Sequence, residues 1–239
     1  MRCRRASTLW RSCPSSGGPR AGRSSAAGER RRSAQSFEAR RPSLPRAACG
    51  GYICFEDEAG FTRKPPRGRT WGRGRTPVVT VSGRRSGRLS VAGLIATRPG
   101  SRIRLCHRLR THRAGKSMRR SMGERDFIAL IDGVHQLVKA PIVLVWDRLN
   151  THVSHAMGKL IAERKWLTVF LLPAYSPDLN PVEWVWAHVK RSLANLAVIA
   201  LDRLEALVRN RLKRLQYGSG TLDGFIAGTG LTLDDPASP

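Results

Sequence analysis

Acidic side chains are scarce in this chain of 239 residues. Only 17 Asp and Glu stand against 43 Lys and Arg, which gives a formal net charge of +26. Residues 1–50 carry 12 Arg and 2 Glu, so the remaining residues still hold 31 basic and 15 acidic side chains. Such a field attracts polyanions, and we expect nucleic acid to be the partner.

Cysteine pairs and long apolar runs are also missing from the sequence. The five cysteines are odd in number and form no CxxC pair. This argues against a disulfide framework and a zinc site, and it suits a reducing cytosol. No apolar run approaches the roughly 20 residues that cross a bilayer. We therefore expect a soluble, cytoplasmic protein without a membrane partner.

Large apolar side chains are few in residues 1–49, which consist mainly of Arg, Ser, Gly, Pro and Ala. Such a segment cannot bury enough surface to offset the entropy lost on ordering, so we expect a disordered basic N-terminal arm. An organelle transit peptide and a shifted reading frame ahead of the true domain are alternative interpretations.

From residue 50 onward, apolar periodicity predicts strands and helices. The expected strands are 51–58, 76–83, 88–97, 101–109, 141–147 and 166–173. The expected helices are 121–140, 151–165, 181–196 and 201–216, the first opened by Ser121 and Glu124 in capping-box spacing.

The order of these elements indicates the fold class. Strands and a hairpin come first, and helices then alternate with short apolar strands, which predicts an α/β fold with a mixed sheet flanked by helices. This is also the order of the ribonuclease H-like fold. We assign 50–217 to one domain and 218–239 to an irregular tail.

The few acids fall at informative places. Asp57 ends the first expected strand, between Glu56 and Glu58, and Asp147 ends the central apolar strand. Sites in open α/β sheets gather beyond the carboxyl ends of parallel strands, although acids there are often only solvated loop residues. Asp57 and Asp147 would share such a site if their strands are neighbours.

Glu183 has two compatible interpretations. Asn180 is a good N-cap, Pro181 suits the first helical position, and Glu183 falls at the third, close to a capping box. A cap is worth about 1 kcal/mol and would explain the sequence without catalysis. On the helical repeat, however, Glu183 flanks the core stripe of Val182, Val185, Trp186, Val189, Leu193 and Leu196, and it could face the strand ends.

Three carboxylates gathered together would repel one another, and their pKa values would rise. Divalent cations reverse that balance, and Mg²⁺ in particular prefers oxygen ligands while keeping positions open for phosphate and water. Acids within a basic surface therefore indicate metal-dependent chemistry on a nucleic-acid backbone.

Three stretches resemble a known family. FEDEAGF (55–61), VLVWDRLNTH (143–152) and LPAYSPDLNPVEWVW (172–186) are similar to DDE transposases of bacterial insertion sequences in the mariner-like superfamily, most of all to the group numbered six hundred and thirty. The resemblance covers about 50–217.

Residue by residue, the resemblance implies a catalytic triad of Asp57, Asp147 and Glu183 that holds two Mg²⁺ ions, with Mn²⁺ as a substitute. Asp57 would bridge both ions. Glu56 and Glu58 are the alternatives to Asp57 as the first catalytic acid. Strand alternation puts them on the face opposite Asp57, and the family's Asp-Glu pair matches Asp57-Glu58. The implied reaction is DNA cleavage at element ends, followed by strand transfer, usually into TA dinucleotides. A homodimer on double-stranded DNA near the bacterial nucleoid is the implied setting.

The sequence departs from the family in two places. Arg148 stands where many relatives have Asn, and residues 1–49 show no helix-turn-helix for recognising terminal repeats. Asn150 and His152 could support the site, touch DNA or cap the next helix. The expected DNA contacts are Arg67, Arg69, Arg73, Arg148, Asn150, His152, Lys190 and Arg191.

Three functions therefore remain open from the sequence. The favoured one is a transposase catalytic domain. The others are an inactive, truncated remnant that only binds DNA, and another ribonuclease H-like nuclease or integrase.

Overall fold

A computed structural model describes residues 50–64, 87–113, 121–174, 176–196, 198, 200–218 and 220–230. The arm expected at 1–49, the strand expected at 76–83, and Arg67, Arg69 and Arg73 lie outside the described residues.

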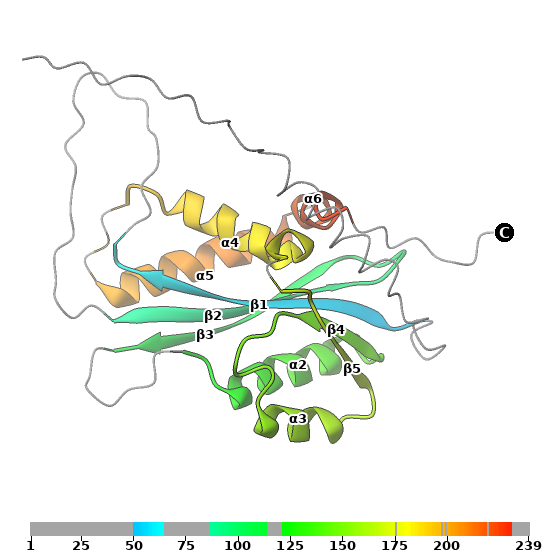
Figure 1. Ribbon diagram of the computed structural model, residues 1–239. Coiled ribbons are helices and arrows are strands. Elements are labelled where there is room, and N and C mark those ends of the chain that lie inside the picture. Colours follow the sequence, from blue (N-terminus) through cyan, green and yellow to red (C-terminus); the bar gives the residue numbers. More distant parts are fainter. Residues whose placement is uncertain are drawn as a thin grey trace, which may run out of the picture.

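A five-stranded mixed sheet forms the centre of the described chain (Figure 1). Its spatial order is β3-β2-β1-β4-β5; β1 and β3 both pair antiparallel with β2, whereas β1, β4 and β5 run parallel. The strands are β1 (Tyr52–Thr62), β2 (Arg88–Thr97), β3 (Arg104–His112), β4 (Ile142–Trp146) and β5 (Leu167–Leu171). The predicted mixed sheet is confirmed.

Helices cover both faces of the sheet (Figure 1). On one face lie α2 (Glu124–Val138) and α3 (His155–Ala162), which supply the crossovers that parallel neighbours require. The opposite face carries α4 (Pro181–Ser192), preceded by the short 3₁₀ turn η2 (Pro177–Leu179), and then α5 (Leu201–Tyr217) and α6 (Thr221–Gly228).

Strand alternation divides the apolar side chains between two cores. Phe55 and Phe61 of β1 face the core beneath α4, whereas Cys54 faces the core beneath α2. All five residues of β4 are buried, as expected for a parallel strand covered on both faces. We call the core beneath α4 the first core and the core beneath α2 the second core. Trp186 is the largest side chain of the first core, and Trp146 is the largest of the second.

Several predicted boundaries need correction. Helix α2 is capped by Gly123 and not by Ser121, because the carboxylate of Asp126 accepts from the Gly123 N–H at 3.1 Å. Arg108 and Arg110 of β3 bind the same carboxylate and so hold the start of α2 at this position. Helix α3 begins late because the Ser154 hydroxyl caps it by accepting from the Met157 N–H.

The sequence predicts an irregular tail after α5, but this part of the chain contains a short helix. Residues Thr221–Gly228 form α6, because Leu222 and Ile226, four residues apart, bury one face of a short helix in the first core. At the end of α4, Leu193 is buried as predicted, but Leu196 lies beyond the helix and is 37% exposed. Within the described part of the chain, no helix is long and apolar enough to span a membrane.

Candidate active site

Asp57 and Asp147 lie opposite each other on neighbouring parallel strands. The last registered pair of β1 and β4 is Phe55 with Val145, and each aspartate follows two residues later. Asp147 comes directly after β4, as predicted, but Asp57 lies in the middle of β1 and not at its end. Strand β1 runs on to Thr62 because its later residues still pair with β2.

Asn180 places Glu183 beside these aspartates. Its side-chain oxygen accepts from the Val182 N–H at 3.1 Å, which confirms the predicted N-cap of α4. Its side-chain amide donates to the backbone carbonyl of Glu56 at 2.9 Å. One buried amide therefore caps α4 and ties the start of that helix to β1, next to Asp57.

Trp186, one turn after Glu183, reaches Asp57 directly. Its indole N–H donates to Asp57 Oδ2 at 2.8 Å. The ring can lie this close because Gly93, the β2 partner of Asp57, has no side chain: a Cβ there would lie 2.7 Å from the ring. The sequence placed Trp186 only in the core stripe, although a buried indole N–H usually needs an acceptor.

The three acids influence one another electrostatically. Burial first, and then the charges of Glu183 and Asp147, raise the pKa of Asp57 to about 7, although hydrogen bonds from the Glu58 backbone and Trp186 act to lower it. Among the described residues, the Glu183 carboxylate has no hydrogen-bond or ion-pair partner. As the side chains stand, no three His, Cys, Asp or Glu of the described chain lie close enough to hold one ion.

Glu56 and Glu58 point away from this cluster, as the predicted alternation requires. Glu56 is fully buried on the α2 side of the sheet, and burial raises its pKa well above the usual range, followed by the charges of Asp57, Asp147 and Glu58. Glu58 accepts from the Met122 backbone N–H at 3.4 Å. Asp57 is therefore the member of the three that faces Glu183.

His152 is a functional candidate whose position the sequence did not define. Its side chain is 1% exposed, so the predicted DNA contact does not fit its burial. Its Nδ1 lies 2.9 Å from Asp147 Oδ1, where the ring N–H donates to the carboxylate. That hydrogen bond, with a second from the Leu149 N–H, holds the pKa of Asp147 below its usual range.

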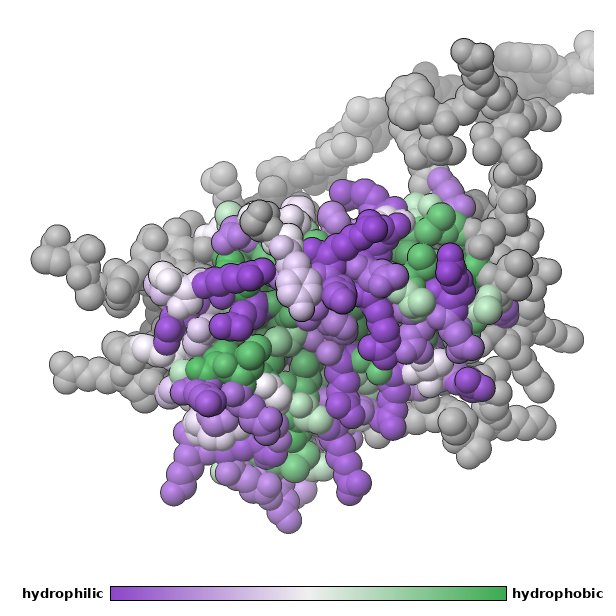
Figure 2. Space-filling model, turned by 180° about the vertical axis from the view of Figure 1, so that it is seen from behind, coloured by the Kyte–Doolittle hydropathy of each residue, from purple (hydrophilic) through white to green (hydrophobic). Residues whose placement is uncertain are grey.

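The other predicted DNA contacts that fall within the described residues are exposed. Arg148 and Asn150 are exposed just after Asp147, and Lys190 and Arg191 are exposed in the last turn of α4. Figure 2 shows, on the face seen from behind, many hydrophilic side chains with apolar patches between them.

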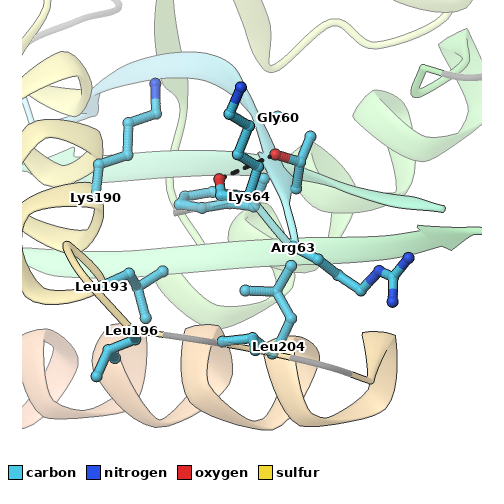
Figure 3. A pocket seen from close by; sticks show the side chains of 10 residues that line it. Gly60, Arg63, Lys64, Lys190, Leu193, Leu196 and Leu204 are labelled. Carbon is cyan, nitrogen blue, oxygen red and sulfur yellow. Dashed lines mark hydrogen bonds between the residues drawn. The ribbon is translucent and has the colours of Figure 1, made fainter. Parts of the chain in front are cut away.

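A cavity of about 200 Å³ lies beyond Trp186, between the end of β1 and the end of α4. Leu193 and Leu196 supply apolar lining, and Arg63, Lys64 and Lys190 supply the charges. Lys64 and Lys190 extend in the same direction, whereas Arg63 points away from them (Figure 3). Lys190 stands roughly 10 Å along the axis of α4 from Glu183, seven residues at 1.5 Å each.

Comparison with known proteins adds a family match. A family model described as DDE superfamily endonuclease matches residues 52–205. No curated protein matches the chain significantly.

Solved structures add a match in fold. The Mos1 mariner paired end complex with Mn matches with a TM-score of 0.55 and 13% identity, over 94% of this chain and 63% of that one. The corresponding complex with Mg matches with a TM-score of 0.53 and 13% identity, over 95% of this chain and 63% of that one. The Mos1 strand transfer complex matches with a TM-score of 0.52 and 14% identity, over 95% of this chain and 62% of that one. The ribonuclease H-like fold class is thereby confirmed, and this chain spans less than two thirds of those chains.

Substitutions at Asn180 should separate its two hydrogen bonds. Asn180→Ser keeps a capping oxygen but is too short to reach the Glu56 carbonyl, whereas Asn180→Ala loses both contacts. We expect Ala to cost roughly 2–3 kcal/mol in urea unfolding, and Ser about 1 kcal/mol less than Ala. A Ser variant as stable as the original chain would show that the bond to β1 contributes nothing.

Asp57→Asn should stabilise the chain in a pH-dependent way in metal-free buffer. With its pKa raised to about 7, folded Asp57 keeps a proton that the unfolded chain loses near pH 4, so stability falls as pH rises between those values. The amide can still accept from Trp186. We expect a gain of roughly 1–3 kcal/mol at pH 8 and almost none at pH 4.

The matched control for this change is Asp223→Asn, which removes an exposed carboxylate from α6. Thermal unfolding of both variants at the two pH values provides the measurement. An Asp57→Asn gain that is equal at both pH values, or no larger than the control, contradicts the raised pKa.

Proposed function

This chain belongs to the DDE superfamily of endonucleases, and from that membership we propose that it is a transposase that cleaves DNA and transfers the cut strand. The observation that carries the proposal is the placement of Asp57, Asp147 and Glu183. The support for it is that two parallel strands carry the aspartates side by side, that Asn180 ties the start of α4 to β1, and that burial and the charges of Glu183 and Asp147 raise the pKa of Asp57.

The three acids suit a hard divalent cation. They are oxygen donors only, burial and the charges of Glu183 and Asp147 raise the pKa of Asp57 to about 7, and Glu183 has no partner among the described residues. We propose two Mg²⁺ ions, with Mn²⁺ as a substitute, which Asp57, Asp147 and Glu183 would hold. When bound, such ions stabilise the attacking and leaving oxygens of an in-line phosphoryl displacement.

The reaction that follows has two displacements at phosphorus. Water attacks a backbone phosphate at the element end, the P–O3′ bond breaks, and a 3′-hydroxyl is released. This hydroxyl then attacks a phosphate of the target DNA and displaces a target 3′-oxygen. In this second step one phosphodiester bond forms as another breaks. The Trp186 indole and the His152 ring donate hydrogen bonds to Asp57 and Asp147, respectively.

The partners are double-stranded DNA at the element ends and at the target. Arg148 and Asn150, just after Asp147, and Lys190 and Arg191, in the last turn of α4, are exposed and can bind phosphates. Lys190 lies about three nucleotides of duplex rise from Glu183, so it would contact the backbone beside the scissile bond. By family resemblance, we extend the proposal to insertion at TA, a homodimer on DNA, and a bacterial nucleoid setting.

Removing any one of the acids should abolish cleavage. We expect Asp57→Asn, Asp147→Asn and Glu183→Gln each to lower Mn²⁺- or Mg²⁺-dependent nicking of supercoiled DNA by at least about 100-fold. Asp178→Asn, which removes an exposed acid two residues before the Asn180 cap, is the matched control and should retain activity.

The outcomes of that assay distinguish the candidate functions. Nicking together with strand transfer supports a transposase, whereas nicking without transfer indicates another ribonuclease H-like nuclease. If the unaltered chain and the variants bind DNA alike and none cleaves it, the protein is a binding remnant and the proposal fails.

The lysines at the cavity should act on DNA affinity through phosphate contacts. The double substitution Lys64→Ala and Lys190→Ala removes two such contacts, so the slope of log K against log salt should become shallower by about 1.8. Lys159→Ala, at an exposed site on α3 across the sheet, is the control and should leave the slope unchanged. Equal slopes for all three proteins contradict DNA binding at the cavity.

A further inference from the structure

His152 lies in a slot that fixes the plane of its ring. The ring stacks on Trp146, with centroids 4.1 Å apart and planes 3° apart, and it meets the edge of Phe127 at 4.7 Å. Its backbone N–H donates to the Leu149 carbonyl at 2.8 Å, which closes the turn after β4. With its side chain 1% exposed, the imidazole cannot turn without disturbing the core beneath α2.

The two ring nitrogens face two acids on neighbouring strands. Nδ1 lies 2.9 Å from Asp147 Oδ1, and Nε2 lies 3.3 Å from Glu56 Oε2. The second contact is at ion-pair distance without well-aligned hydrogen-bond geometry, so we regard the first as the directional one. Glu56 is fully buried and closes the far side of the ring.

These contacts leave one oxygen of Asp147 open. Oδ1 accepts from both the His152 ring and the Leu149 N–H, whereas Oδ2 accepts no hydrogen bond from the described residues. The Asp147 side chain is 53% exposed. The Asp147 carboxylate is thus held through Oδ1, which leaves Oδ2 available to a ligand.

We propose that His152 is a positioning residue that orients Asp147 as a metal ligand, with buried Glu56 lying against the other side of the ring. The inference rests on the proposed function, because it assigns Asp147 to the metal. His152 acts through Asp147 and touches neither DNA nor the ion. Partners of this kind fix the direction of a ligand, and their loss typically lowers metal affinity by about 10–100-fold.

Packing alone is the competing explanation, and two substitutions separate it from positioning. The side-chain amide of Asn is as many bonds from Cα as Nδ1 of His, so His152→Asn can still donate to Asp147. In His152→Gln the amide corresponds to Nε2 and faces Glu56 instead. Both variants lose the ring that stacks on Trp146, so packing is disturbed similarly in the two.

The experiment measures Mn²⁺ affinity by calorimetry, together with Mn²⁺-dependent nicking and Tm, on the full chain. We expect His152→Asn to bind Mn²⁺ within about threefold of the original chain and His152→Gln to bind at least about tenfold more weakly. The two variants should have similar Tm values. Equal Mn²⁺ affinity in the two variants, whether reduced or unchanged, overturns the proposal.

Asp147→Asn distinguishes failure of this proposal from failure of the proposed function. If Asp147→Asn weakens Mn²⁺ binding while the two His152 variants behave alike, only the positioning role fails. If Asp147→Asn binds Mn²⁺ as the original chain does, the metal assignment of Asp147 fails, and the role of His152 fails with it.

Discussion

The buried side chain of Asn180 is the contact on which the geometry of the site depends. Its two hydrogen bonds join the first turn of α4 to the backbone of β1 at Glu56, where the neighbouring strand β4 has just ended. Glu183 is then placed by the helical repeat, and Trp186, one turn later, adds its own hydrogen bond to Asp57. A single amide therefore aligns the helix with the strand pair that carries Asp57 and Asp147.

Negative charge is concentrated here in a chain whose net charge is +26. Asp57 is held by the Trp186 indole from the α4 side, and Asp147 by the His152 ring from the α2 side. Both donors fix the direction of a carboxylate, but the pKa of Asp57 is still raised to about 7, by burial first and then by the charges of Glu183 and Asp147. The site is destabilising when empty of cations, which is the usual relation between function and stability.

The sequence predicted the parts of this site that depend on local patterns. The cap at Asn180, the apolar strand β4 and the acid that follows it are local signals, and all are found in the structure. The continuation of β1 past Asp57 is not local, because it depends on pairing with β2. The Trp186–Asp57 contact likewise requires Gly93 on another strand, 93 residues away from Trp186 in sequence.

His152 shows the same limit in another form. A histidine after a strand is compatible with a surface loop, and only the flanking Trp146 and Phe127 make it buried. Helix α6 was missed because its Gly and Thr content suggests a tail, while its two buried apolar side chains gain stability only against the first core.

Anomalous diffraction from crystals of the chain grown with Mn²⁺ tests the central claim most directly. The account predicts manganese peaks coordinated by Asp57, one of them shared with Asp147 and the other with Glu183, while Asn180 still bonds to the Glu56 carbonyl. Manganese bound elsewhere, or coordinated by Glu56 or Glu58 in place of Asp57, would contradict it.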